Sequence, residues 1–365
     1  MKENFDAIII TSDEPYGEMW HTQLLYADCL SINYKVIFIN PPKKWNITNC
    51  FRWSLKQKAI ADNLTIVNYL NIVPGVFNFL NEYWFDQKIL QALKKMRYRR
   101  LLIWHFDSFR AAISSKQLFN ALEIKRIYHV IDPFIDNPLD EWLSVKADKI
   151  VITSPRNLRA YKKYESKIMH IPQALDLNML DEKKNSELVI KPKFSQNYFV
   201  LLGTISDYID YEFLFSILED GELKLVIIGK VLTNMTNLQS WERLKKMNNV
   251  DYLGVLSPLN FNPILRDAKA GLIIYNEERR KNVSSPLKAL NYLGCGIPVV
   301  TNIDCEMPDL NEKCIFYVDN THELDKVLKE IIFGIKGIDK ELANNYIQQN
   351  SIQNALKKIL EGVYS

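Results

Sequence analysis

The feature that most constrains the fold is an alternation of short apolar runs with helical patterns along the chain. The runs in the first half are DAIIITS, YKVIFINP, LTIVNY, RLLIWHFD, RIYHVID, KIVITS and KIMHIPQ, and those in the second are YFVLLGT, KLVIIGK, VDYLG, GLIIYN, IPVVT and CIFYV. Helical segments such as 19–30, 82–96 and 155–164 lie between such runs. Parallel strands need a crossover between them, usually a helix, so this order predicts an α/β protein with parallel sheets.

The length and one polar segment predict two domains. At 365 residues the chain is too long for one ordinary core. The segment 181–196, DEKKNSELVIKPKFSQ, is polar, charged and without a hydrophobic period, so it is the best linker candidate. We therefore expect doubly wound domains at 1–180 and 197–344, with ligands in a cleft between the carboxyl ends of their strands.

Composition excludes several other classes of protein. Hydrophobic residues make up 47% and charged residues 24%, as in ordinary globular proteins, and a net charge of +3 is too small to indicate nucleic acid binding. The five cysteines form no CxxC and no metal-binding spacing with histidine, so we expect reduced thiols, no metal and no cofactor. The start of the chain has no secretory signal, and no stretch is long enough to span a bilayer. We expect a cytoplasmic protein.

The block from Ser284 to Asn302, SSPLKALNYLGCGIPVVTN, has the most specific local pattern. Ser285 can cap a helix, and Pro286 suits its first position, where the missing N–H needs no partner. Gly294 or Gly296 ends the helix, and IPVVT then predicts a buried strand. A helix N-terminus that follows a parallel strand offers free N–H groups and a positive dipole, so this place suits a diphosphate.

This block resembles the donor-binding segment of GT-B glycosyltransferases related to glycosyltransferase family 4, whose usual form is PLK-x-x-E-Y-L-A-x-G-x-P-V-V. The matching positions are Pro286, Leu287, Lys288, Tyr292, Leu293, Gly296, Pro298, Val299 and Val300. Asn291 stands where the family has its ribose-binding Glu, and Val283 replaces the first Glu of the family's E-x7-E pair. The resemblance implies a GT-B fold of two Rossmann-like domains and a nucleotide-sugar site. It also implies that a last helix, at about 345–365, packs back on the first domain.

A second resemblance lies at the start of the second domain. The segment VLLGTISDYID is similar to the G-x-I-x-x-x-x-D opening of glucuronosyltransferases of the teichuronic-acid and xanthan type. By that similarity Gly203 and Thr204 face the diphosphate or the transferred sugar, and Asp210 begins a helix. Lys230 ends the next strand, near where related enzymes hold the nucleobase. An ordinary turn and a surface lysine explain these positions equally well.

The resemblance also implies where the charge of the diphosphate is neutralised. Lys288 is the first choice because it lies in the first turn of the helix, and the preceding loop adds Arg279, Arg280 and Lys281, which a solvated charge run also explains. The expected donor-binding residues are Gly203, Thr204, Lys230, Arg279, Ser284, Ser285, Pro286, Leu287, Lys288 and Asn291.

The base should come from the first domain, because transfer with inversion needs a carboxylate or histidine to deprotonate the attacking hydroxyl. We expect Asp132 in YHVIDPFID, since related sequences carry an aspartate at the matching strand end; capping of a turn with Pro133 is the alternative. Asp13 is the second catalytic candidate, and it alternatively holds the acceptor or caps the first helix. The acceptor-side candidates are His105, His129 and Asp136.

Structural roles explain His105 and His129 as well as acceptor binding does.

Departure of the diphosphate is helped by N–H groups, the helix dipole and cations, so no metal is expected in this fold. The absent Glu pair and the Gly203 segment favour inversion over retention.

Two stretches interleave cations with aromatic residues, KKWNITNCFRWSLKQK at 43–58 and FNFLNEYWFDQKILQALKKMRYRR at 77–100. Such composition suits an anionic leaflet, where each cation contributes on the order of 1 kcal/mol. The alternative is an aromatic core face beside a solvated basic face.

Together these features predict a glycosyltransferase of bacterial surface-polysaccharide assembly. It would move a sugar, most simply from a UDP-sugar, to a saccharide or lipid-linked acceptor. Two alternatives stay open: a nucleotide-sugar 2-epimerase of the same fold, and a catalytically inactive GT-B subunit that binds a partner or the membrane.

Overall fold

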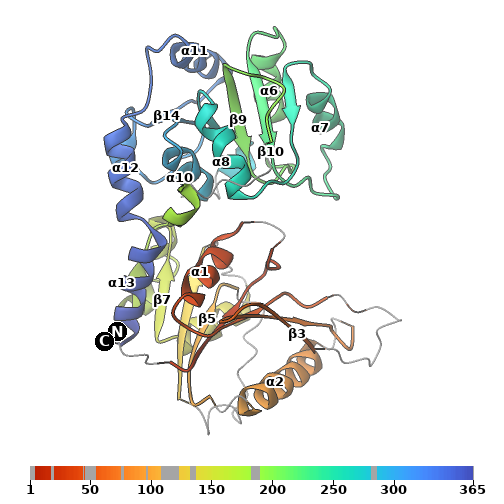
Figure 1. Ribbon diagram of the computed structural model, residues 1–365, viewed down its shortest axis with the longest axis vertical. Helices are drawn as coiled ribbons and strands as arrows, with labels where there is room; N and C mark the ends of the chain where they lie inside the picture. The colour runs from red at the N-terminus through yellow and green to blue at the C-terminus, as the bar shows by residue number, and fades with distance from the viewer. Residues whose placement is uncertain are drawn as a thin grey trace. The chain divides into compact units, whose positions relative to one another are not determined.

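The computed structural model describes residues 5–17, 20–43, 45, 55–74, 78–95, 98–107, 123–131, 137–181, 190–280 and 286–364. The chain forms two compact units, Met1–Pro172 with Ile352–Ser365, and Gln173–Ser351. Each unit is built around its own sheet, as the two series of apolar runs predict (Figure 1).

The first unit contains an eight-stranded sheet in the order β3-β4-β2-β1-β5-β6-β7-β8. Its strands are β1 (Ala7–Thr11), β2 (Val36–Ile39), β3 (Leu55–Ala61), β4 (Leu64–Tyr69), β5 (Arg100–His105), β6 (Glu123–Val130), β7 (Lys149–Ile152) and β8 (Ile168–His170). Its helices are α1 (Thr22–Ser31), α2 (Asn78–Lys95), α4 (Pro138–Lys146), α5 (Pro155–Leu158), η3 (Lys162–Lys167) and α13 (Ile352–Tyr364).

All neighbouring strands of this sheet pair in parallel except β3, which is antiparallel to β4. β1 is wholly buried, and it pairs with β2 on one side and β5 on the other. The order of the strands reverses there, so the carboxyl ends of β1 and β5 form a topological switch point, where open α/β sheets bind ligands.

Helices cover both faces of the first sheet (Figure 1). Phe85, Ile89 and Leu93 of α2 pack on one face, and α1 and α13 lie side by side on the other. α13 carries the chain back to this unit, and the ring of Tyr364 stacks on Phe5 with centroids 5.4 Å apart.

The second unit contains a six-stranded sheet in the order β11-β10-β9-β12-β13-β14, with parallel pairing throughout. Its strands are β9 (Tyr198–Leu202), β10 (Lys224–Ile228), β11 (Val250–Tyr252), β12 (Gly271–Ile273), β13 (Val299–Thr301) and β14 (Ile315–Tyr317). Its helices are η4 (Leu177–Leu180), α6 (Tyr211–Leu218), α7 (Leu238–Lys245), α8 (Pro258–Asp267), α9 (Glu277–Arg280), α10 (Leu287–Gly294), η6 (Pro308–Leu310), α11 (Thr321–Ile332) and α12 (Lys340–Gln349).

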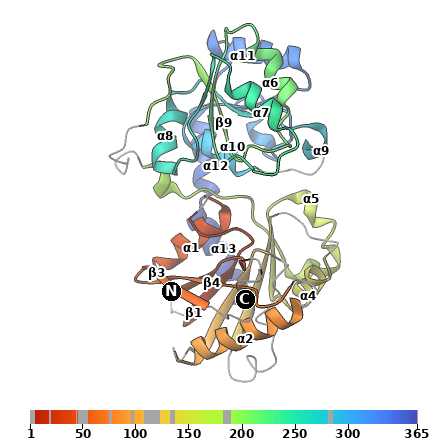
Figure 2. The ribbon, with the colours of Figure 1, turned by 90° about the vertical axis from the view of Figure 1, so that its right-hand side faces the viewer.

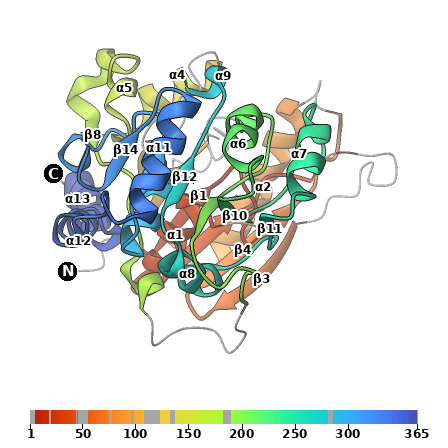
Figure 3. The ribbon, with the colours of Figure 1, turned by 90° about the horizontal axis from the view of Figure 1, so that it is seen from above.

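Two apolar layers enclose this sheet. α8, α10 and α12 pack on one face (Figure 2), and α6, α7 and α11 pack on the other (Figure 3). The order of the strands reverses between β9 and β12, so the carboxyl ends of these two strands form a second switch point. As expected, Asp210 caps α6, its side chain accepting from the Phe213 N–H at 3.0 Å.

The boundary between the units differs from the expected linker. The chain enters the second unit at Gln173, before the polar segment 181–196. The physical reason is apolar: Leu175 is buried in the second core, and Leu177 and Leu180 pack against it. The lack of hydrophobic periodicity in segment 181–196 therefore did not mark the boundary between the two cores. Half of the segment, 182–189, lies outside the described residues.

Of the two basic and aromatic stretches, the structure describes Lys56 and Lys58 of the first and most of α2 in the second, and these lysines lie on the face of the sheet opposite α2. The first ends in β3, an edge strand that the apolar pattern does not reveal because five of its seven residues are polar or small. Gln57 of β3 borders a small internal space together with Ile89 and Leu93 of α2. Since successive side chains of a strand point to opposite faces, Lys56 and Lys58 point away from α2, which carries the exposed Trp84.

None of the helices in the described ranges combines the length and the apolar content that crossing a bilayer requires.

Candidate functional site

The switch point of the second sheet brings together the elements of the predicted donor site. The chain leaves β9 through Gly203 and leaves β12 towards Tyr275; helix α9 comes next, and α10 begins at Leu287. Gly203 thus reaches the same end of the sheet as Tyr275 and Lys288, which lie more than seventy residues further along the chain.

Lys288 is the cation at this end of the sheet. Its ammonium nitrogen lies 4.8 Å from the centroid of the Tyr275 ring, a cation–π contact, and the half-buried side chain runs past Gly203. A Cβ atom placed on Gly203 would lie 2.9 Å from this nitrogen. Among the described residues Lys288 forms no ion pair, so its charge is available to an anion. This is the position that the sequence predicts for the diphosphate.

Gly203 itself has a backbone conformation that favours glycine, with φ +126°. Gly229, at the end of β10, packs directly against it, because a Cβ atom there would lie 1.8 Å from the Gly203 carbonyl oxygen. The two glycines allow the backbone after β9 and the backbone after β10 to approach closely. Because neither glycine carries a side chain, few atoms cover the carboxyl ends of β9 and β10 beside Lys288.

Tyr292 fixes the helix that carries Lys288. Its hydroxyl accepts the Leu202 N–H at 2.8 Å and lies 3.3 Å from the Val200 and Leu272 carbonyl oxygens. The ring is fully buried and lies against Gly271, where a Cβ atom would be 2.2 Å from it. The motif tyrosine thus ties α10 to β9 and β12, which sets the position of the helix N-terminus.

The start of α10 differs by one residue from the expectation. Pro286 is the N-cap, with an extended backbone, and the helix begins at Leu287. The Pro286 carbonyl accepts the Ala289 N–H at 3.0 Å, so the proline stands just outside the first turn. Ser284 and Ser285, the other expected residues of this corner, lie outside the described residues.

Asn302 is a site residue that sequence reasoning missed. It is buried, its Oδ1 accepts the Tyr275 N–H at 2.9 Å, and its Nδ2 donates to the Tyr275 carbonyl at 2.7 Å. The amide therefore holds the backbone of the residue whose ring supports Lys288. The only signal in the sequence was a polar residue directly after the buried strand IPVVT.

The other expected donor residues lie around this centre in different ways. Thr204 is half-buried and Lys230 is exposed after β10. The Arg279 guanidinium stacks over the Tyr208 ring at 5.0 Å, which places it on the loop that follows β9. Asn291 donates its Nδ2 to the Leu287 carbonyl at 3.2 Å.

The switch point of the first sheet carries carboxylates instead. Thr11 and His105 are paired residues of β1 and β5, and Asp13 and Asp107 each follow two residues later. Part of Asp13 is open to solvent, yet desolvation of its carboxyl group, followed by repulsion from Asp107 and from Glu14, raises its pKa to about 6. A carboxyl group with that pKa is mostly ionised at neutral pH and can accept a proton.

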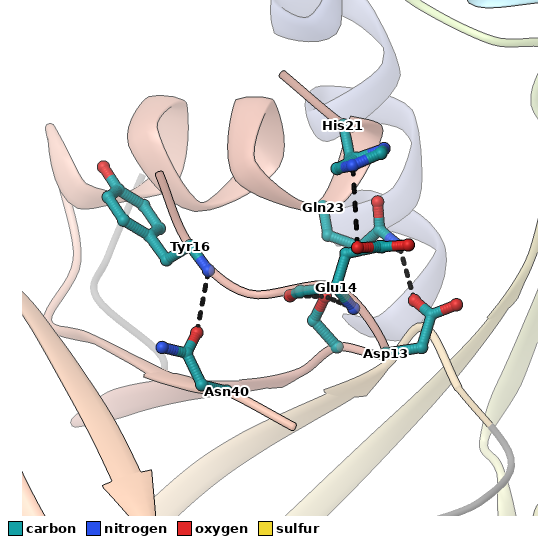
Figure 4. A network of polar contacts seen from close by, with 7 residues as sticks. Asp13, Glu14, Tyr16, His21, Gln23 and Asn40 are labelled. Carbon is teal, nitrogen blue, oxygen red and sulfur yellow. Dashed lines mark hydrogen bonds and ion pairs between the residues drawn. The ribbon is translucent and has the colours of Figure 1, made fainter. Parts of the chain in front are cut away.

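A network of polar contacts holds the loop that carries Asp13 (Figure 4). Gln23 of α1 donates to the Asp13 carboxylate at 2.9 Å, and His21 lies 3.8 Å from the Glu14 carboxylate. Asn40, which follows β2, accepts the Tyr16 N–H at 2.8 Å. The Asp13 side chain is therefore oriented by α1, and its loop is anchored to the neighbouring strand.

His105 is buried in the first unit, and both of its ring nitrogens have partners. Its Nε2 lies 3.0 Å from the Arg126 guanidinium and its Nδ1 lies 3.2 Å from the Thr11 hydroxyl. Arginine can only donate, so Nε2 accepts and Nδ1 carries the proton. This placement favours the structural interpretation of His105.

His129 lies in an aromatic cluster with Tyr26, Trp104 and Phe106. The Trp104 indole N–H donates to its Nδ1 at 3.3 Å, and burial lowers its pKa to about 3. It therefore stays neutral and buried at physiological pH, as its structural interpretation requires. Asp132 and Asp136, the first choice of base and its neighbour, lie outside the described residues.

In the parts of the chain that the structure describes, no group of three or more His, Cys, Asp or Glu side chains is arranged to hold a metal ion.

Comparison with protein-family models finds no match, and comparison with curated proteins finds none either. Solved structures do match over almost the whole chain. A trehalose-6-phosphate protein from E. coli bound with UDP-2-fluoro glucose is 12% identical, with a TM-score of 0.69 and 98% of each chain covered. A trehalose-6-phosphate synthase studied for glycosyl transfer with retention is 11% identical, with a TM-score of 0.66 and 98% of each chain covered.

A lipopolysaccharide outer core galactosyltransferase without ligand is 13% identical, with a TM-score of 0.63; the match covers 98% of this chain and 99% of that one. These likenesses show that the chain has the GT-B fold, in agreement with the prediction from the sequence. At such identities they show the fold alone.

Proposed function

We propose that this chain is a glycosyltransferase that moves a sugar from a nucleotide donor, a UDP-sugar, to a saccharide acceptor. The observation that carries the proposal is the placement of Lys288 at the switch point of the second sheet, over Tyr275 and against Gly203. The structural neighbours support it, since they include a protein bound with a UDP-sugar analogue and a galactosyltransferase.

The second unit binds the donor in this proposal. The Lys288 ammonium and the free N–H groups at the start of α10 hold the diphosphate, whose negative charge grows as the sugar leaves. Gly203 lets the backbone approach the phosphates closely. Asn291, in place of the usual Glu, bonds a ribose hydroxyl through its amide oxygen, while its Nδ2 is held by the Leu287 carbonyl.

The first unit supplies the base. The Asp13 carboxylate accepts the proton of the attacking acceptor hydroxyl. The oxygen of that hydroxyl bonds to the anomeric carbon of the donor sugar, and the bond from this carbon to the diphosphate oxygen breaks. Asp13 replaces Asp132 as the first candidate here, because its pKa of about 6 and its bond from Gln23 suit a base at neutral pH. Asp132 is the second candidate.

We propose inversion, without a metal ion, as the stereochemical course. A positioned base in the first unit and the lack of a Glu at positions 283 and 291 support it. The trehalose-6-phosphate synthase neighbour was studied for transfer with retention, so the stereochemical course of this chain has to be measured directly. Proton NMR of the first product decides it: an anomeric configuration opposite to that of the donor supports inversion, and the same configuration refutes it.

The proposed setting is bacterial surface-polysaccharide assembly, in capsule or lipopolysaccharide synthesis, with a lipid-linked acceptor and peripheral contact of the chain with the inner membrane surface. The galactosyltransferase neighbour, described as acting in the lipopolysaccharide outer core, supports this setting. Sugar transfer to lipid-linked saccharides extracted from bacteria tests it, with free sugars as the comparison.

The donor is tested by thermal shift with UDP, GDP, ADP, CMP and their sugars. A ligand that binds only the native state stabilises it by about 2.7 kcal/mol at a hundred times its dissociation constant, which is easily detected. A selective rise with UDP or one UDP-sugar supports the proposal. No response to any nucleotide would favour the second candidate, an inactive GT-B subunit, for which the replacement of Glu by Asn291 speaks.

A further inference from the structure

A polar hollow of about 520 Å³ lies in the first unit, away from the carboxyl ends of its strands. Its lining residues precede or begin β1, β2, β4 and β5, so it lies at the amino end of the sheet, opposite the end that carries Asp13. The lining residues are Phe5, Asp6, Asn33, Tyr34, Lys35, Asn63, Tyr98, Arg99 and Arg100. Its volume is within the range of small-molecule sites, about 300–1,000 Å³.

The charge of the lining is positive, with three cations and one carboxylate. Asp6 is already used by the fold: its Oδ2 accepts the Arg99 N–H at 2.7 Å and the Arg100 N–H at 2.8 Å, and its Oδ1 lies 3.4 Å from the Arg100 guanidinium. The backbone bonds from Arg100 and Arg99 lower the pKa of Asp6, so it stays ionised as the clasp between β1 and β5.

Two cations of the hollow are left for a ligand. Lys35 and Arg99 are both exposed, and within the described ranges neither side chain forms an ion pair. An ammonium group and a guanidinium group that converge on one hollow suit an oxyanion, and the guanidinium can bind phosphate or carboxylate with two hydrogen bonds.

The neutral part of the lining suits sugar hydroxyls. Tyr34 and Tyr98 supply phenol groups, and Asn33 and Asn63 supply amides that both donate and accept. Burial and the nearby Asp6 raise the pKa of Tyr98, so its hydroxyl stays protonated. Phe5 adds an apolar ring to the lining, and this ring is itself stacked on Tyr364.

We propose that this hollow is a second binding site, for an acidic saccharide whose phosphate or carboxylate is held by Lys35 and Arg99. The ligand is a free acidic sugar or the headgroup of a lipid, which share this chemistry. The site lies outside the machinery assigned to sugar transfer, and it stands or falls independently of that function.

The test uses the full chain carrying Lys288→Ala, which removes the main phosphate contact of the second unit. Inorganic phosphate and glucose 6-phosphate are titrated by calorimetry at low salt, and vesicles with 30% anionic phospholipid are tested by cosedimentation. The Lys35→Gln/Arg99→Gln variant is compared with Lys146→Gln/Lys162→Gln, which removes two exposed cations elsewhere on the unit. Arg99→Gln keeps the backbone N–H that bonds Asp6.

We expect saturable binding of at least one probe that becomes tenfold weaker or more in the Lys35/Arg99 variant and is unchanged in the control. Tighter binding of glucose 6-phosphate than of phosphate identifies a free acidic sugar, whereas binding of vesicles alone identifies a lipid headgroup. Absence of saturable binding to every probe, or equal loss in both double variants, would overturn the site. UDP binding by the chain with Lys288 intact reports separately on the proposed function.

Discussion

The two sheets of this protein present opposite charges at equivalent places. Both have a topological switch point at the carboxyl ends of two central strands, β1 and β5 in the first unit, β9 and β12 in the second. The second places the Lys288 ammonium there, on an aromatic ring and beside a glycine. The first places Asp13 and Asp107 there, with the pKa of Asp13 raised. The same architecture is thus prepared for an anion in one unit and for a proton in the other.

The two places also differ in how the chain encodes them. In the second unit one contiguous block supplies Lys288, the tyrosine that fixes its helix, and Asn302, which holds its aromatic support. In the first unit Asp13 and Asp107 come from segments about ninety residues apart that meet only through pairing of β1 with β5. A ligand site can be read from a motif, whereas a raised carboxyl pKa depends on which groups the fold brings together.

The largest effect is expected when the Asp13 carboxylate, at the switch point of the first sheet, is replaced by a neutral amide. Asp13→Asn should lower kcat by about 10²–10⁴-fold while UDP affinity stays the same, because the base acts only in the transfer step. In the wild type kcat should rise with pH through about 6, where Asp13 ionises. The measurement is transfer rate and UDP affinity for Asp13→Asn and Asp132→Asn side by side. A fully active Asp13→Asn chain would move the base elsewhere.

The stability of this variant gives an independent reading of the same carboxyl group. The pKa of Asp13 is about 6 in the folded chain and near 3.9 when unfolded, so the folded state binds more protons between these values. Folding stability therefore falls as pH rises from about 4 to about 6. Asp13→Asn should lack this fall and be at least as stable as the wild type at pH 7. A lower Tm at pH 7 would contradict the raised pKa.

At the switch point of the second sheet, Gly203→Ala should weaken UDP binding by about tenfold. The new Cβ atom, 2.9 Å from the Lys288 nitrogen, displaces the ammonium, and a positive φ costs a non-glycine residue about 1–2 kcal/mol. Gly221→Ala is the matched control, since Gly221 also has a positive φ, of +76°, with open space around it. Both variants should lose stability, and only Gly203→Ala should lose affinity. Equal UDP affinities would show that Gly203 does not set the position of Lys288.

Removing the tyrosine hydroxyl that fixes α10 should reduce the free energy of unfolding of the second unit. Tyr292→Phe leaves the buried Leu202 N–H without its acceptor, which costs about 1–3 kcal/mol. Urea unfolding measures this, with Tyr317→Phe as a control at an exposed tyrosine of the same unit. If the two variants unfold at the same urea concentration, the hydroxyl does not anchor the helix.

At the buried histidine of the first unit the effect is absent at neutral pH and grows only as the pH falls. The pKa of His129 is about 3 in the folded chain and near 6.5 when unfolded, so stability is lost as pH falls below about 6.5. One such group contributes a slope of up to about 1.4 kcal/mol per pH unit. His129→Phe should reduce the slope between pH 6.5 and 4 by this amount, and His170→Phe at an exposed position should not. An unchanged slope in His129→Phe would mean that His129 titrates in the folded state.

The features of the fold and the site that could be predicted from the sequence are those set by residues close together in the chain. The apolar runs gave every strand except β3, whose alternating lysines and small residues do not report a core, and the helix cap at Asp210 followed from local hydrogen bonding. The position of Lys288 was predictable because its motif is contiguous. The raised pKa of Asp13 and the hydrogen bonds between Asn302 and Tyr275 were not, because both depend on side chains and backbone groups that meet only once the strands pair.

The most direct test of the account is a calorimetric titration of UDP into the wild type, Lys288→Ala and Lys340→Ala, the last a control at an exposed lysine of the same unit. We expect Lys288→Ala to weaken UDP binding by about 10- to 150-fold, the range for a charge-assisted contact, and Lys340→Ala to match the wild type. UDP that binds Lys288→Ala as tightly as the wild type would contradict the assignment of the second unit's switch point as the donor site.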